Sequence, residues 1–268
     1  CAPTDDPPAS SLRLSLAWYT AQPLAANLVA SLRLHDAFGR LLAQCDLQPG
    51  YGFQPSITWP AAAWTDDRLA LPLPAQLPDA APYTLAVQLY DGLGETRLVH
   101  RLGELDWTAT TLQVSPITAQ VTLPPDLLPT AAQFGNVAAL RGYRLTYPEP
   151  ESVAVTFYWE ALGTSRASVV RFVQLLDTAG QIVTRGDGST VQVDSLPQAN
   201  SYPTSQWAAS EIVADTLLLS LAGVPPGAYE LAVGFYPPGD ANARLPVTLP
   251  GGATPPDRIL RLPLSVER

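Results

Sequence analysis

One β-rich pattern occurs twice in this chain, and that internal repeat constrains the fold more than any other feature. Residues 12–18 match residues 153–159, which lie 141 positions further on. Residues 83–90 match residues 229–236, where the spacing has grown to 146 positions. Solenoid repeats run about 20–50 residues, so a repeat of this size indicates whole domains. The sequence therefore predicts two homologous domains, the second with a slightly longer middle loop.

Strict alternation within the matching segments predicts antiparallel strands. Leu12, Leu14, Leu16 and Trp18 point to one side while the residues between them point to the other, as in strands with one buried face. Short turns that begin with Asp and end with Gly follow several of these strands, and they are typical of hairpin loops. The predicted fold class is all-β, with two tandem immunoglobulin-like antiparallel β-sandwiches that arose by internal duplication.

Composition shifts divide the chain into four parts. The predicted parts are an N-terminal tether (1–10), β-sandwich domain 1 (11–123), a Pro-rich connector (124–132) and β-sandwich domain 2 (133–268).

The two copies differ at their starts. Domain 2 has an additional strand-like segment at residues 134–145, upstream of its matching strand, whereas domain 1 has only the tether there. Domain 1 is thus expected to lack one edge strand, and an uncovered edge is a pairing surface. Residues 111–123 are the local candidate to fold back over this edge, and a strand from a neighbouring molecule is the alternative. Fold-back is favoured because the segment is already tethered.

Charge and composition exclude some partners. The formal net charge is −9 and the pI is about 4.6, which speaks against nucleic acid and anionic membrane surfaces. The 28 prolines argue against long helices. All 15 basic residues are Arg and Met is absent. We favour a GC-rich genome as the reason. A thermophilic habitat is the alternative, and the many prolines in loops also fit it.

The first residues, Cys1 followed by a short polar, Pro-rich stretch, resemble the start of a mature bacterial lipoprotein. The resemblance implies a lipid anchor on Cys1 and a location outside the cytoplasm at the cell surface. A sequence boundary that happens to fall at Cys is the alternative. Cys45 is the other cysteine, so a disulfide could only join Cys1 to Cys45, and an acylated Cys1 would leave Cys45 as a buried thiol.

The sequence offers no constellation typical of catalysis. The two histidines, His35 and His100, sit on predicted strands and are expected at ordinary edge or surface positions. Glu149, Glu151 and Glu160 are close in sequence and could form a glycosidase pair, although carboxylates at strand ends are usually solvated. We predict no enzyme activity, no cofactor and no metal site.

Loop aromatics are the better lead. Tyr51, Trp59 and Trp64 fall in the middle loop of domain 1, and Tyr202 and Trp207 fall in the matching loop of domain 2. Such rings could stack on sugars as in a carbohydrate-binding module. The alternative, which we favour, is that the loops fold over the open ends of the sandwiches and bury these rings.

Several segments of the second half carry a family resemblance. They are residues 134–136, 140–143, 157–159, 172–177, 202–207 and 226–236. Through them the chain resembles a β-sandwich region of filamentous thermophilic bacteria, found in secreted proteins and appended to membrane glycosyltransferases of the dolichyl-phosphate-mannose type. The resemblance implies a β-sandwich fold and an extracytoplasmic location, and it brings no catalytic residues.

Together these observations predict a non-enzymatic, extracytoplasmic and lipid-anchored protein. It would act through protein–protein contacts in a cell-surface or membrane-associated assembly, with self-association among the contacts, and would touch the membrane only through the lipid on Cys1. A carbohydrate-binding module that uses the loop aromatics is the alternative function.

Overall fold

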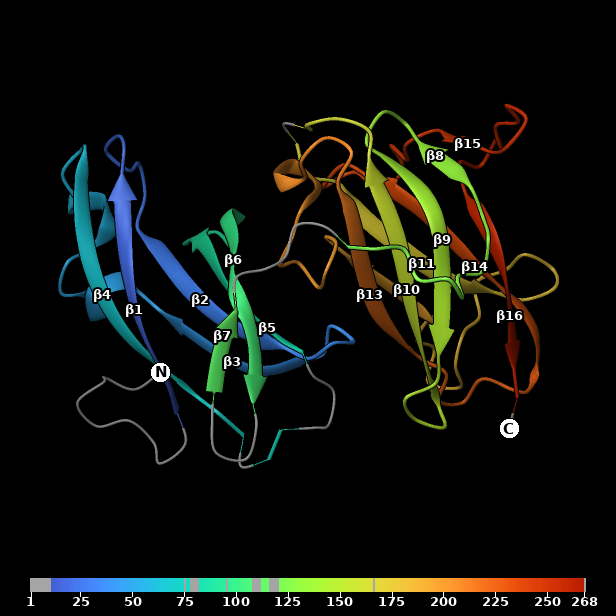
Figure 1. Cartoon of the computed structure of the whole chain (residues 1–268), viewed down its shortest axis with the longest axis horizontal. Helices are drawn as coiled ribbons and strands as arrows, with labels where there is room; N and C mark the ends of the chain where they lie inside the picture. The colour runs from blue at the N-terminus through green and yellow to red at the C-terminus, as the bar shows by residue number, and fades with distance from the viewer. Residues whose placement is uncertain are drawn as a thin grey trace. The chain divides into compact units, whose positions relative to one another are not determined.

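The computed structural model describes residues 11–74, 76–77, 82–94, 96–107, 112–115, 121–165 and 167–267. The chain divides into two compact units, Cys1–Ile117 and Thr118–Arg268, called domain 1 and domain 2 here. In the described residues both units are built from antiparallel strands, with three short 3-10 turns as the helical segments (Figure 1). The all-β prediction is confirmed. The predicted tether with its lipid-anchor residue Cys1 lies outside the described residues.

Domain 1 has two sheets in its described part. β1 (Ser11–Thr20) and β4 (Ala63–Pro72) pair over ten residues and form a sheet by themselves. The second sheet has the order β3 (Leu41–Leu47), β2 (Leu28–His35), β5 (Tyr83–Asp91), β6 (Thr96–Trp107) and β7 (Leu112–Ser115). Between the sheets lies an apolar core that includes Leu12, Leu32, Leu69, Leu85 and Leu105. The turns η1 (Pro49–Gly52) and η2 (Ser56–Thr58) belong to the loop between β3 and β4.

Domain 2 has the same plan with more strands. One sheet has the order β13 (Ile212–Ser220), β10 (Ser152–Ala161), β9 (Ala138–Thr146), β8 (Ala132–Phe134) and β15 (Val247–Thr248). The other has the order β12 (Gln192–Ser195), β11 (Val170–Leu176), β14 (Gly227–Tyr236) and β16 (Leu260–Val266), and η3 (Thr204–Gln206) lies between β12 and β13. An aromatic cluster centred on Trp159 fills the core, with the rings of Phe134, Phe157 and Phe235 at 5.0–5.3 Å from it.

A tryptophan–aspartate hydrogen bond marks the repeat in three dimensions. Trp18 Nε1 donates to Asp67 Oδ2 at 3.3 Å in domain 1, and Trp159 Nε1 donates to Asp215 Oδ2 at 3.2 Å in domain 2. In both domains the aspartate is on the neighbouring strand, opposite the residue two positions before the Trp. The two Trp residues therefore occupy equivalent positions, as the repeat predicts.

The environment of that aspartate differs between the copies. In domain 2, Arg171 is fully buried and its Nε lies 3.3 Å from Asp215 Oδ2. The residue 141 positions earlier is Ala30, which offers no charge. Asp67 is nevertheless buried, and its Oδ1 has no hydrogen-bond partner. Domain 1 thus keeps the carboxylate of the repeat without its arginine.

The predicted Asp–Gly turns form as expected. Asp36 Oδ1 accepts bonds from the backbone N–H groups of Phe38 and Arg40, and Gly39 has a φ of 77°. The equivalent turn of domain 2 repeats this with Asp177 and with Gly180 at a φ of 75°. A positive φ at the last position favours Gly, which explains the shared pattern.

The expected fold-back of residues 111–123 over the first strand of domain 1 is wrong for the described part of that stretch. Leu112–Ser115 forms β7, which pairs with β6 in the other sheet. A segment that follows β6 after a short connection closes a smaller loop by pairing with β6 than by crossing to the opposite sheet. Among the described residues β1 pairs with β4 alone.

Candidate functional site

Among the described residues, the outer edge of β1 is not paired with another strand. Ala62 N donates to Thr20 O at 2.7 Å, so the polar backbone groups of Thr20 face β4. Backbone groups alternate along a strand, so those of Arg13, Ser15, Ala17 and Tyr19 face away from β4. In the described part of the chain no strand pairs with this side.

Domain 2 shows what occupies the equivalent edge. At the spacing of 141, residues 13–20 of β1 correspond to residues 154–161 of β10, and all eight of these pair with β9. β8 then extends the sheet beyond β9 and places Phe134 against Trp159, with ring centroids 5.3 Å apart. In its described residues domain 1 has no counterpart of β8 and β9.

The missing neighbour leaves apolar side chains of β1 partly uncovered. Leu14, Leu16 and Trp18 point into the sandwich but are only partly buried. Their counterparts in β10, Val155, Phe157 and Trp159, are all 0 % exposed. The inward positions are the same in both copies, so the difference follows from β9, which covers β10 and has no counterpart beside β1 in the described part of the chain.

In the other sheet of domain 1, β6 also carries inward-facing side chains that are exposed. His100 pairs with the buried Val87 and Leu98 pairs with Leu89, and directly opposite residues of an antiparallel pair share a face. Both side chains therefore point toward the inside, yet His100 is exposed and Leu98 is 42 % exposed. The counterpart of His100 in β16 is the buried Leu260.

These features define the open side of domain 1: the outer edge of β1, the side chains Leu14, Leu16 and Trp18, and the β6 side chains Leu98 and His100. Proteins usually blunt exposed edges with short strands, prolines, bulges or charges. β1 has ten residues in unbroken register with β4, contains no Pro, and carries a single charge at Arg13. The edge is therefore competent to pair with another strand.

Among the predicted sugar-binding residues, two in domain 1 are exposed. Trp64, on the outward face of β4, is 69 % exposed, and its ring lies 5.0 Å from that of Tyr19, which is 55 % exposed and directly opposite on β1. Tyr51 is partly exposed and its hydroxyl donates to Arg68 O on β4. Sequence reasoning missed Tyr19 because it considered aromatics on loops, and alternation along β1 was the signal that could have found it.

The other predicted sugar-binding residues, Trp59, Trp207 and Tyr202, are buried or partly buried. Trp59 is buried and donates from Nε1 to Gln54 O at 3.0 Å, and Trp207 is buried and donates to Tyr202 O at 3.1 Å. Tyr202 is buried in part, and its hydroxyl donates to Glu211. Rings held this way cannot stack on a sugar that arrives from solvent, so the prediction that the loops bury their Trp residues holds at Trp59 and Trp207.

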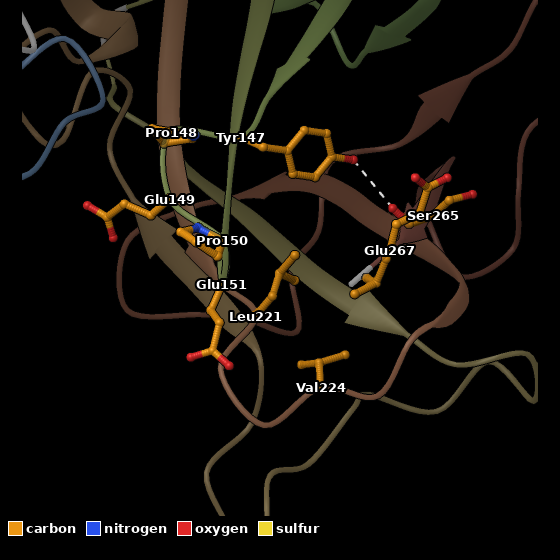
Figure 2. A pocket seen from close by; sticks show the side chains of 10 residues that line it. Tyr147, Pro148, Glu149, Pro150, Glu151, Leu221, Val224, Ser265 and Glu267 are labelled. Atoms are coloured by element: carbon orange, nitrogen blue, oxygen red, sulfur yellow. Dashed lines mark hydrogen bonds between the residues drawn. The ribbon is translucent and has the colours of Figure 1, made fainter.

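A pocket of about 960 Å³ lies at one end of domain 2, and it brings Glu149 and Glu151 together with Tyr147, Leu221 and Glu267. Figure 2 shows Glu149 and Glu151 pointing away from Tyr147, whose hydroxyl donates to Ser265 O at 3.4 Å. Burial and the nearby Glu267 raise the pKa of Tyr147. Cleavage of a glycosidic bond requires two carboxyl groups that flank the bond. The carboxylates of Glu149 and Glu151 diverge instead.

The other titratable residues singled out in the sequence lie apart from this pocket. Glu160 lies apart from the pocket and pairs with Arg141 at 2.5 Å. Burial lowers the pKa of His35 to about 4. In the part of the chain that the structure describes, no three His, Cys, Asp or Glu side chains gather as metal ligands, and no helix has the length and apolar character needed to cross a membrane.

Cys45 on β3 is buried and disulfide-bonded. The sequence contains one other cysteine, Cys1. Since a lipid thioether and a disulfide both consume the sulfur of a cysteine, acylation of Cys1 and a Cys1–Cys45 bond exclude each other.

Comparisons with known proteins assign no family to the chain. No family model matches it, and no curated protein matches it. Among solved structures it is similar to the exo-chitosanase CsxA of Amycolatopsis orientalis, with 13 % identity, 89 % of this chain and 25 % of that chain covered, and a TM-score of 0.26. A variant of the same enzyme in complex with PNP-beta-D-glucosamine gives 13 % identity, coverages of 88 % and 25 %, and a TM-score of 0.27. The chain thus spans about a quarter of the length of these enzymes, and TM-scores this low carry no functional argument.

Proposed function

We propose that this chain is a non-enzymatic, extracytoplasmic protein that acts through protein–protein contacts in a cell-surface or membrane-associated assembly. The observation that carries the proposal is the outer edge of β1, with which no other described strand pairs. Free backbone N–H and C=O groups in strand geometry are recognised by another polypeptide strand through main-chain hydrogen bonds, so this edge selects for protein partners. The partly uncovered Leu14, Leu16 and Trp18 add apolar surface beside it.

A pair of proline variants tests the proposal. Ala17→Pro removes an N–H that points away from β4, at the free edge of β1. The hydrogen bonds between β1 and β4 are kept. Asp66→Pro is the matched control, because Asp66 lies directly opposite Ala17 on β4 and its N–H faces away from β1. Tagged full-length chains are crosslinked in the native host and purified. Partners retained by the wild type and by Asp66→Pro but lost by Ala17→Pro support the proposal, and identical partners for all three contradict it.

The disulfide of Cys45 supports the extracytoplasmic part of the proposal, since disulfides persist in oxidising compartments. The lipid anchor on Cys1 is a rival proposal, because acylation would use the sulfur that a Cys1–Cys45 disulfide requires. Mass spectrometry of the N-terminal peptide from the native source, without reduction, distinguishes the outcomes. A diacyl- or triacylglyceryl mass on Cys1 supports the anchor, and a peptide linked to Cys45 rules it out.

Carbohydrate binding is the second candidate function, and the exposed pair of Tyr19 and Trp64 favours it. Exposed aromatic rings supply the flat apolar surface on which a sugar ring stacks, and Phe53 in the same domain is 89 % exposed. A glycan array probed with the wild type and with Trp64→Ala tests this function. Binding that Trp64→Ala abolishes and Ala17→Pro preserves supports it, while an array without any bound glycan rules it out.

A further inference from the structure

The open side of domain 1 has the form of a sandwich from which a strand is missing, and domain 2 supplies the template. We propose that this side binds an extended segment of a partner protein, about eight residues long, which runs antiparallel along β1 and places large apolar side chains over Trp18 and Leu16. This inference rests on the proposed function and names the chemistry of the partner.

Hydrogen-bond geometry sets the length and direction of the segment. The outward backbone groups of Arg13, Ser15, Ala17 and Tyr19 span residues 13–19, and the corresponding stretch of β10 pairs antiparallel with β9 over eight positions. A segment of similar length would satisfy every free group of this edge. Shorter segments would leave part of the edge unpaired.

Side-chain burial in domain 2 sets the chemistry. Phe134 of β8 and Leu140 and Tyr143 of β9 are all buried in the core that contains Trp159. In domain 1 the equivalent space borders Trp18 and Leu16, which are only partly buried. An incoming strand must therefore be apolar on its inward face, while its outward face lies in solvent beside Ser15 and Ala17, which are exposed.

A second copy of β1 does not fit this edge as well as a single strand. β10 contacts β14 in domain 2 through Trp159 and Phe235, whose rings are 5.0 Å apart, so β1 is expected to lie over β5. β6 and β7 then extend past the edge of β1 in the facing sheet. A two-fold partner that offered its own β1 would bring its own β6 and β7 into the same space. A lone extended segment avoids this conflict.

The test uses a peptide of residues 132–146, the segment that covers the equivalent edge in domain 2, carrying a fluorescent label. Binding to the full chain is measured by anisotropy. The controls are a peptide of the same composition in scrambled order, and one in which Phe134 and Leu140 are replaced by Ser. We expect the native peptide to bind, both control peptides to bind more weakly, and Ala17→Pro to weaken binding about tenfold or more, since one hydrogen bond is lost and a carbonyl is left unpaired. Asp66→Pro should bind as the wild type does.

A second readout locates the peptide. Trp18 becomes buried when the segment binds, so the tryptophan emission of the wild type should shift to the blue while that of Trp18→Phe should not. Circular dichroism and urea unfolding confirm that each variant is folded. Equal affinity of the wild type, Ala17→Pro and Asp66→Pro overturns the proposal, as does equal binding of the native and scrambled peptides. Self-association of the full chain that Ala17→Pro abolishes assigns the edge to a second copy and also overturns it. If partners crosslink to the edge in the host but the peptide fails to bind, the proposed function stands and the proposed apolar strand is wrong.

Discussion

Replacing His35 with Leu, the residue that the repeat carries at position 176, should make the stability of the protein less sensitive to acid. The side chain of His35 is only 6 % exposed and its Nδ1 has no hydrogen-bond partner. Burial lowers its pKa from 6.5 to about 4; the charge of Arg33 acts in the same direction and that of Asp36 opposes it. Asp36 is itself paired with Arg40 at 2.6 Å.

The sign of the effect follows from proton binding. The pKa of His35 is lower in the folded state than in the unfolded chain, so the unfolded state takes up the proton first as the pH falls. Above about pH 6.5 His35 is neutral in both the folded and the unfolded state, so it causes no loss of stability there. Each pH unit between 6.5 and about 4 then removes about 1.4 kcal/mol, roughly 3 kcal/mol in all. His35→Leu removes this loss, and at neutral pH it also removes a buried nitrogen without a partner.

Urea unfolding of the wild type and His35→Leu at several pH values between 7.5 and 4 measures the effect. Between pH 7.5 and 4 the free energy of unfolding of the wild type should decrease by roughly 3 kcal/mol more than that of the variant. His100→Leu makes the same substitution at an exposed position of the same domain and is the matched control. Parallel curves for the wild type and His35→Leu would refute the reasoning.

Two further predictions concern the cores. Trp159→Ala should cost about 3–5 kcal/mol of unfolding free energy, since the ring is fully buried among three aromatic rings. Trp18→Ala should cost roughly 2 kcal/mol, because its ring is partly uncovered. Equal losses in urea unfolding would contradict the account of the open side. Arg171→Ala should cost roughly 3–5 kcal/mol by leaving Asp215 charged and buried without its partner. The double variant Arg171→Ala/Asp215→Asn should recover part of that loss in thermal unfolding, and no recovery would mean that the charge of Asp215 is not the cause.

Local patterns predicted most of the fold. Alternation of apolar residues located the matching strands, and the Asp–Gly turns identified hairpin loops, because both depend on side-chain direction and backbone conformation within a few residues. The spacing of the repeat paired Trp18 with Trp159 correctly. These features need no knowledge of distant parts of the chain.

Features that depend on a neighbouring strand were not predictable in the same way. Alternation shows which face of β1 is apolar, but it does not show whether a strand covers that face, so the partial burial of Trp18 came only from the structure. The placement of β7 was predicted wrongly because its sequence suits either sheet and loop closure decided the outcome. The pairing of each Trp with an aspartate was also missed, although Asp67 and Asp215 lie 148 positions apart and could have been noticed as a repeat.

The open side of domain 1 also has a consequence for synthesis of the chain. β1 leaves the ribosome with domain 1, and β8 and β9 follow it before β10 has been made, because β10 begins at Ser152, after β9 ends at Thr146. During that interval β8 can already pair with β9, but β10, its other neighbour, does not yet exist, while β1 offers a homologous edge with matching side-chain spacing. The edge of β1 is therefore a competing pairing surface for β9 during that interval. Domains fold largely as units during synthesis and repeats are prone to cross-pairing, and here the order of strands along the chain places that competition before β10 is complete.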